Sequence, residues 1–386
     1  MQPIQWIRNV RIVVETGIIE SGSVRVEKGR IAAIVIGVPA DLEGQGVLDG
    51  EGKLLIPGMI DVHIHGAKGY DMMDGSLRSI EVVSETCAVT GCTSFLATSV
   101  SSKFEDLQKM IDNVKQAAGK VRGASIVGIH TEGPYLNVKR KGMQNEAFLR
   151  HPDLIEMERI VEQAGSLLKM VTIAPELPGG MGLVSYLRER GIIVAIAHSD
   201  ATYDEATEAF RLGASHITHC FNGMRPIHHR DPGLVVAAFE QPHVSLQAIV
   251  DHVHLHPAII RLMHKIKGAE GMVLITDALH AMGLGDGDYQ FGGHAVKVVD
   301  GVAQLLDGTL ASSTVTMNEA LRNTVELGIS LHDAVTMATR TPADLLGLPQ
   351  KGRIALGADA DLVLLDEHFQ VEWTMIGGKI FAATSE

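Results

Sequence analysis

Eight short apolar runs recur through the middle of the chain, and each is separated from the next by a segment long enough for an amphipathic helix. The runs are Gly58–His65, Cys92–Thr98, Ser125–Glu132, Met170–Pro175, Ile192–His198, His216–Cys220, Ser245–His254 and Met272–Asp277. Apolar runs of this length are typical of parallel strands that are buried on both faces. Their alternation with helices predicts an α/β fold, a TIM-like (β/α)8 barrel.

Both ends of the chain show a different pattern, with short β-like runs, glycine-containing turns and no helical period. The runs are Val10–Val14, Ser23–Val26 and Ile31–Ile36 near the start, and Asp361–Asp366, Val371–Met375 and Lys379–Ala383 near the end. We therefore expect a small β-sandwich domain made from residues 1–56 and 346–386, which brackets a barrel catalytic domain of residues 57–345. A β-like insertion, Gly283–Gly308, is expected to form a hairpin near the barrel mouth.

The composition narrows the class of protein. With 46% hydrophobic residues, the 386-residue chain can bury a sizeable core. Its formal net charge of -13 argues against binding to nucleic acid or to an anionic membrane surface. Residues 1–9 lack the plan of a signal peptide, and no apolar stretch has membrane-spanning length, so a cytoplasmic location is expected. Cys87, Cys92 and Cys220 have no metal-finger spacing and are expected to be buried free thiols.

Polar side chains gather at the C-terminal ends of the predicted barrel strands. They are His63 and His65 on the first run, Glu132 on the third, His198 on the fifth, His219 on the sixth and Asp277 on the eighth. This end of a (β/α)8 barrel is where active sites assemble. Because side chains alternate along a strand, the first two histidines, at a spacing of two, point the same way. The pattern therefore predicts one shared site.

Imidazole and carboxylate groups are the usual ligands of zinc and related divalent ions. The number of groups exceeds what one tetrahedral ion requires, so the pattern fits one or two ions per chain, with Glu132 as a bridge in the second case. Zinc is the first choice, and iron, manganese and cobalt suit the same ligands. Such an ion activates water and polarises a carbonyl group. Asp277 would then move the proton as acid and base, or else serve as a ligand.

Several motifs carry a resemblance to a known family. They are Pro57–Gly66 (PGMIDVHIHG), His130–Pro134 (HTEGP), Ala197–Ser199, Thr218–Met224 (THCFNGM), Thr276–Ala278 and the closing Gly357–Val363. Together they resemble the amidohydrolase superfamily and, within it, the N-acetylglucosamine-6-phosphate deacetylases, along essentially the whole chain. The resemblance implies hydrolysis of the acetamide of N-acetylglucosamine 6-phosphate, with Glu132, His198 and His219 holding the principal metal and Asp277 as the acid/base. Some members lack the first-strand histidine pair and use one ion, which leaves the metal count open here.

The resemblance also implies a set of substrate contacts. Arg230 is similar to the arginine that binds the phosphate group, which in the family comes from the neighbouring subunit and so implies a homodimer. The other residues that the resemblance assigns to the substrate are Gln144, Asn222, Gly223, His254, Leu310, Ala311 and Ser312. Two of them depart from the family pattern: Gln144 stands where some members have histidine, and Gly223 stands in place of the usual alanine.

Two alternatives remain open. The chain could be another amidohydrolase that acts on a different carbon–nitrogen bond, such as a D-aminoacylase, a dihydroorotase or an adenine deaminase. It could also be a catalytically silent scaffold of the same fold. The presence of every expected ligand and of the acid/base argues against the scaffold. The sequence leaves open whether other N-acetylhexosamine 6-phosphates are accepted.

Overall fold

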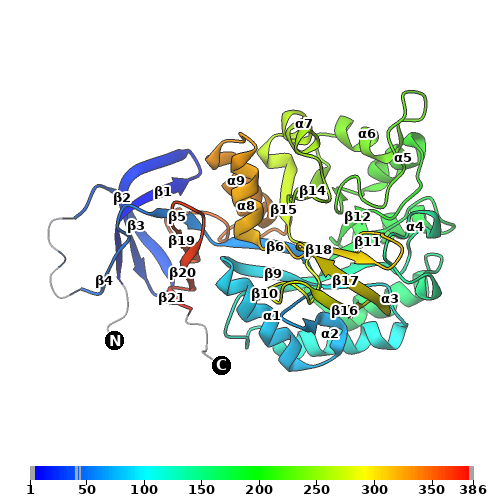
Figure 1. Cartoon of the computed structure of the whole chain (residues 1–386), viewed down its shortest axis with the longest axis horizontal. Coiled ribbons are helices and arrows are strands. Elements are labelled where there is room, and N and C mark those ends of the chain that lie inside the picture. The colour runs from blue at the N-terminus through cyan, green and yellow to red at the C-terminus, as the bar shows by residue number, and fades with distance from the viewer. Residues whose placement is uncertain (1–4, 40–41, 43–44, 382–386) are drawn as a thin grey trace.

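The eight predicted barrel strands form one parallel sheet in the computed structural model, which describes residues 5–39, 42 and 45–381 (Figure 1). In chain order the strands are β6 (Met59–Ile64), β9 (Cys92–Ser99), β10 (Ser125–Glu132), β11 (Leu168–Ile173), β12 (Ile193–Ile196), β13 (His216–Ile217), β14 (Ser245–Ile249) and β15 (Met272–Ile275). Each strand pairs with the next one in this order, from β6 through to β15. The predicted TIM-like barrel is confirmed.

The barrel closes where the chain leaves β15 and meets β6. The backbone N–H of Asp277 donates to the carbonyl of His63 at 2.8 Å, and the N–H of His65 donates to the carbonyl of Ala278 at 2.9 Å. Below these bonds, the buried Asp61 carboxylate accepts a 2.5 Å hydrogen bond from the Thr276 hydroxyl. The closure therefore joins the first and last barrel strands directly beside two of the expected metal ligands.

Helices cover the outside of the barrel. They are α1 (Leu77–Val89), α2 (Phe104–Ala117), α3 (Leu154–Ala164), α4 (Gly180–Glu189), α5 (Tyr203–Leu212), α6 (Gly233–Glu240), α7 (Pro257–Lys267), α8 (Met317–Glu326), α9 (Leu331–Ala338) and α10 (Arg340–Leu345). In α2, Leu107, Met110, Ile111 and Val114 recur at helical spacing and are buried in the main core, while the first turn carries acidic residues. Short 3-10 turns complete the connections: Met72–Asp74, Val138–Arg140, Glu146–Phe148, Gly165–Leu167 and Ala269–Gly271.

Strands from both ends of the chain share one second sheet, called here the terminal sheet. It contains β1 (Trp6–Val14), β2 (Gly17–Glu27), β3 (Arg30–Ile36), β4 (Val47–Asp49), β5 (Leu54–Pro57), β19 (Leu362–Leu365), β20 (Val371–Ile376) and β21 (Lys379–Ile380). The antiparallel pairing of β5 with β19 joins the two ends, and β5 leads directly into β6 (Figure 1). The sheet folds around its own core of residues such as Ile7, Leu55 and Leu362. Residues 1–4 and 382–386 of the predicted β domain, with the end of the run Lys379–Ala383, lie outside the described residues.

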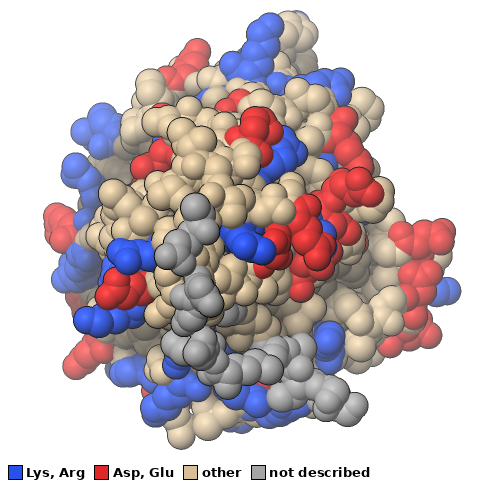
Figure 2. Space-filling model, turned by 90° about the vertical axis from the view of Figure 1, so that its left-hand side faces the viewer, with Lys and Arg blue, Asp and Glu red and all other residues tan. Residues whose placement is uncertain are grey.

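The surface of the terminal sheet is charged but not of one sign. Acidic and basic side chains are interspersed on the face that Figure 2 shows. Arg8 pairs with Asp49 at 3.1 Å and Lys53 pairs with Glu372 at 2.9 Å. Because such exposed pairs contribute only about 0–1 kcal/mol each, the apolar core and not the surface holds this sheet together.

The expected hairpin insertion is a three-stranded antiparallel sheet of β16 (Gly287–Phe291), β17 (His294–Val299) and β18 (Val302–Leu305). Its inner face buries Phe291, whose ring lies 5.5 Å from that of His65, centroid to centroid. A two-stranded ladder of β7 (Gly66–Ala67) and β8 (Tyr70–Asp71) follows β6. The insertion therefore packs against one wall of the barrel mouth.

Cys87, Cys92 and Cys220 are buried and free, as predicted. Burial raises the pKa of the Cys220 thiol to about 12, so this thiol stays protonated at neutral pH. Among the described residues, no helix is both long enough and apolar enough to cross a membrane.

The barrel closure generates a stability prediction. Thr276→Val removes the hydroxyl that donates to the buried Asp61 carboxylate, so it should lower the free energy of unfolding by about 1–3 kcal/mol in urea titrations. Thr131→Val is the matched control, because the buried Thr131 hydroxyl has no hydrogen-bond partner among the residues that the structure describes. Equal losses for the two variants would show that the Thr276 hydroxyl contributes nothing specific to closure.

Candidate metal centre

The six residues expected at the barrel mouth come together there as two buried groups. His63, His65 and Asp277 form the aspartate group, and Glu132, His198 and His219 form the glutamate group. Within each group, the ligand atoms all lie within 4.8 Å of one another. The sequence pattern therefore identified side chains that the fold does bring to one place.

Backbone conformation at the strand ends helps to aim these side chains. His198, His219 and Asp277 have φ values of 45°, 30° and 48°, in the left-handed region that non-glycine residues rarely adopt. Each lies just beyond the end of its strand, at the turn into the following loop. Such a conformation costs about 1–3 kcal/mol and persists only where the surrounding structure enforces it, which is typical of functional sites.

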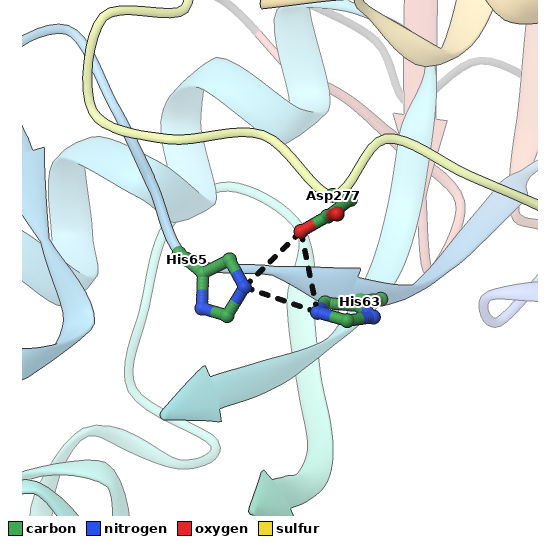
Figure 3. A group of neighbouring side chains, drawn as sticks. All are labelled: His63, His65 and Asp277. Atoms are coloured by element: carbon green, nitrogen blue, oxygen red, sulfur yellow. Dashed lines mark hydrogen bonds and ion pairs between the residues drawn. The ribbon is translucent and has the colours of Figure 1, made fainter. Parts of the chain in front are cut away.

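The aspartate group has the geometry of a ligand set (Figure 3). His63 Nε2 lies 3.0 Å from His65 Nε2, and Asp277 Oδ1 lies 3.3 Å from the first nitrogen and 3.2 Å from the second. Ligands bound about 2.0–2.1 Å from a tetrahedral ion stand roughly 3.3 Å apart, so these separations suit one divalent cation.

The glutamate group is similar in size. His219 Nε2 lies 2.9 Å from Glu132 Oε1 and 3.1 Å from His198 Nε2, while His198 Nε2 lies 3.4 Å from Glu132 Oε1. Glu132 also faces the aspartate group, with Oε2 at 3.5 Å from His65 Nε2. The carboxylate of Glu132 therefore stands between two places that could each hold an ion.

Electrostatics keep the two carboxylates ionised. Burial raises the pKa of Glu132, but His63 and hydrogen bonds with His198 and His219 outweigh it and hold the pKa well below its usual value. Burial likewise raises the pKa of Asp277, and the adjacent His63 and His65 bring this pKa below its usual value. Both side chains are therefore negatively charged acceptors, as cation ligands must be.

A second layer of contacts fixes His198, the histidine of the glutamate group that follows β12. His198 Nδ1 lies 2.8 Å from the carbonyl of Arg140, and because a carbonyl only accepts, Nδ1 carries a hydrogen and Nε2 is the nitrogen that can bind a cation. Arg140 is in turn held by Asp200 through a 2.8 Å hydrogen bond from Nε. Gly223 lies close by with φ of +62°, and a Cβ there would come within 2.7 Å of His198 Nδ1. An alanine at this position would therefore require the loop to shift.

A pocket of about 230 Å³ opens beside the glutamate group and Asp277. Of the residues that the sequence assigns to the substrate, Gln144, Asn222, Gly223, His254, Leu310 and Ser312 line it. Ala311 is fully buried behind this wall. His254 is oriented by Asp251, whose Oδ2 lies 2.6 Å from Nδ1. The pocket therefore gathers most of the expected substrate contacts next to the expected acid/base.

Arg230 is the exception. It lies on an exposed loop, where its Nη1 is 2.8 Å from His229 Nε2, and it does not line the pocket of its own chain. The assignment of Arg230 to a neighbouring subunit's site stays a prediction.

Three buried side chains support the ligands in ways that the sequence did not indicate. Gln144 was expected only as a substrate contact, and Asp61 and Gln247 were not assigned to the site. Gln144 donates from Nε2 to Glu132 Oε2 at 2.7 Å and accepts the backbone N–H of Ser101 at 2.9 Å. Asp61 fastens the barrel closure, and Gln247 contacts His63. The only signal for Asp61 and Gln247 was a polar residue inside an apolar strand. Sequence alone cannot distinguish such a residue from an ordinary hydrogen-bonded core residue.

Residues 54–381 match the Amidohydrolase family. The chain belongs to this family. It is 38% identical over 385 residues to the N-acetylglucosamine-6-phosphate deacetylase of Lysinibacillus sphaericus, with 98% of each chain covered. It is also 32% identical over 377 residues to the N-acetylgalactosamine-6-phosphate deacetylase of Escherichia coli O157:H7, covering 97% of this chain and 98% of that one.

A solved structure extends the likeness to three dimensions. A mutant of N-acetyl-D-glucosamine-6-phosphate deacetylase from Mycobacterium smegmatis, in complex with N-acetyl-D-glucosamine-6-phosphate, matches with a TM-score of 0.91 at 33% identity. The match covers 99% of this chain and 100% of that one. Within the amidohydrolases, the chain is therefore a member of the N-acetylglucosamine-6-phosphate deacetylase branch, as its motifs predict.

The two-group geometry predicts the metal content. Replacing His63 with Gln and His65 with Asn should lower the bound metal by about one ion per chain, because the aspartate group loses two ligands while the glutamate group keeps all of its own. Elemental analysis of protein dialysed against buffered Zn²⁺ measures this. Identical metal content in the double variant and the parent would mean that the aspartate group holds no ion.

Proposed function

We propose that this amidohydrolase removes the acetyl group from N-acetylglucosamine 6-phosphate and releases glucosamine 6-phosphate and acetate. The observation that carries the proposal is the position of Asp277, which belongs to a ligand group and also lines the pocket. The substrate of the proposal comes from relatives that match over nearly the whole chain and are named N-acetylglucosamine-6-phosphate deacetylases. The proposed substrate is a small molecule, and the role belongs to amino-sugar catabolism or recycling.

In this proposal, Glu132, His198 and His219 hold the principal divalent ion, with zinc as the first choice, and His63 and His65 contribute to a second position. The bound ion would activate water and polarise the acetyl carbonyl. The ionised Asp277 takes one proton from the attacking water as the new carbon–oxygen bond forms. It then gives that proton to the sugar nitrogen as the carbon–nitrogen bond breaks, so that the amine leaves in neutral form.

The other residues of the proposed site bind the substrate. Asn222, Gly223 and His254 line the pocket and are proposed to contact the sugar phosphate, while Leu310, Ala311 and Ser312 are proposed to form or back the wall beside Asp277. Ser312 Oγ lies 3.4 Å from Asp277 Oδ1 and can orient this carboxylate. Gln144 has a second amide hydrogen beyond the one given to Glu132, and it can donate this to the substrate.

Arg230 is proposed to bind the phosphate of a substrate held by the neighbouring subunit of a homodimer. Its exposure and its place outside the pocket of its own chain support this arrangement. A guanidinium suits phosphate because it forms paired, charge-assisted hydrogen bonds. A cytoplasmic location stays a prediction.

N-acetylgalactosamine 6-phosphate is a second candidate substrate, because a relative that is 32% identical over nearly the whole chain carries that name. The two sugars differ only in the configuration at C4. A comparison of kcat/KM for both substrates on one preparation decides between them.

The activity itself is the first test. Purified protein should release acetate and free amine from N-acetylglucosamine 6-phosphate, should lose this activity after chelation, and should regain it with Zn²⁺, because the chemistry depends on a bound ion. Turnover that persists after verified metal removal would overturn the mechanism. Turnover of other amides without any of this one would overturn the substrate.

Asp277→Asn tests the proton transfer. The amide keeps the size of the side chain but cannot take a proton, so kcat should fall by about 10²–10⁴-fold. The exposed Asp288→Asn on the insertion is the control and should keep normal turnover. Near-normal kcat in an Asp277→Asn variant with unchanged metal content would remove Asp277 from the role of acid/base.

Arg230→Ala tests phosphate recognition. It should raise KM for the 6-phosphate substrate by about 10–100-fold, the scale of a lost charge-assisted contact, and leave unphosphorylated N-acetylglucosamine unaffected. Arg261→Ala, an exposed arginine on α7, controls for the change in net charge. Mixed dimers of Arg230→Ala and Asp277→Asn chains should recover activity through one intact site. An unchanged preference for phosphate would move the phosphate contact elsewhere.

A further inference from the structure

Gln247 is a fully buried polar residue in the middle of the short apolar strand β14. Its side chain contacts residues from three other parts of the barrel, namely His63 on β6, His219 beyond β13 and Met170 on β11. It therefore points into the barrel interior, directly behind the ligands. None of the steps proposed above uses it.

One contact fixes the orientation of the Gln247 amide. The backbone N–H of His219 lies 3.1 Å from the side-chain atom assigned as Oε1. A backbone N–H can only donate, so the atom that it meets must be the amide oxygen and not the amide nitrogen. The usual ambiguity between the two ends of a glutamine side chain is thereby removed.

The orientation of the amide in turn fixes the tautomer of His63. The same Oε1 lies 3.0 Å from His63 Nδ1, and an amide oxygen only accepts. His63 Nδ1 therefore carries a hydrogen, which leaves Nε2 as the nitrogen that can offer a lone pair to a cation. That Nε2 is the atom that faces His65 and Asp277 across 3.0 Å and 3.3 Å.

We infer that Gln247 is a positioning residue for both ligand groups: its single amide oxygen sets the tautomer of His63 and ties this ring to the backbone of His219. The part of the inference that treats these histidines as metal ligands rests on the proposed metal-dependent function. The partner on a ligating histidine's other nitrogen fixes the ring's orientation and raises its basicity. Here one acceptor serves a histidine of the aspartate group and the main chain of a histidine in the glutamate group.

An ordinary core role accounts less well for this residue. Among the described residues, the amide nitrogen of Gln247 donates only to the Met170 sulfur, at 3.8 Å, and sulfur is a weak acceptor. A poorly satisfied buried N–H group is costly, and methionine would fill the same volume without that cost. Glutamine is therefore explained by its oxygen, which satisfies two donors that an apolar side chain would leave without an acceptor.

The wild-type chain provides a test that needs no destabilising variant. In ¹⁵N-histidine-labelled protein, with the His63 signals assigned by their loss in His63→Gln, the spectrum should show a protonated Nδ1 in both the zinc-free and zinc-loaded chain. A zinc-free spectrum with the hydrogen on His63 Nε2 would overturn the inference.

Two substitutions then separate the oxygen from the volume of the side chain. Gln247→Met keeps length and removes the acceptor, so it should weaken Zn²⁺ binding by about 10–100-fold and change the His63 signals. Gln247→Glu keeps an acceptor and should retain the protonated Nδ1 signal. Thr172→Val, another polar loss in the barrel interior, is the control and should bind Zn²⁺ as the parent does.

Zinc content at fixed free Zn²⁺, measured by equilibrium dialysis and elemental analysis, provides the affinities. If Gln247→Met shows parental zinc binding and parental His63 signals, Gln247 positions neither group. A parent chain that binds no Zn²⁺ would defeat the proposed metal-dependent function, while the tautomer of His63 would still decide the role of Gln247.

Discussion

The hydrogen bonds that close the barrel between β6 and the segment after β15 are the contact on which the site depends. They place the main chain of Asp277 against that of His63, so the carboxylate and the two first-strand histidines meet because the sheet closes and not because a loop happens to fold over. The buried Asp61–Thr276 contact reinforces this closure one residue before Asp277. A rigid scaffold is what positions ligands within the fractions of an ångström that metal geometry demands.

The site also concentrates charge in a place that water barely reaches. Glu132 and Asp277 are both buried, and an isolated carboxylate in such surroundings would protonate. Four imidazoles prevent this, and a divalent ion would do so more strongly. The unusual backbone at His198, His219 and Asp277 adds a local cost that the apolar barrel must offset. The two carboxylates and the four imidazoles therefore depend on one another for their stability.

The sequence predicted the barrel and the six ligand candidates because both leave regular traces. A doubly buried strand leaves an apolar run, and active-site residues stand at its C-terminal end, as Glu132 ends the run that starts at Ser125. The contacts of Gln247 and Gln144 left no such trace, because their partners lie on other elements of the fold. The placement of Arg230 outside its own pocket could not be deduced either, since its position depends on loop conformation and not on any periodic pattern.

The pairing of β5 with β19 has a consequence for how the protein is made. A ribosome releases β5 before any of the barrel strands, but its partner β19 is released only after all of them. The barrel strands are complete long before that moment, so the nascent protein carries an apolar strand edge, Leu54–Pro57, that waits without this partner. Unpaired edges of this kind invite contact with other chains. Covering this edge is therefore a late event in biosynthesis, and any premature stop before β19 leaves it exposed.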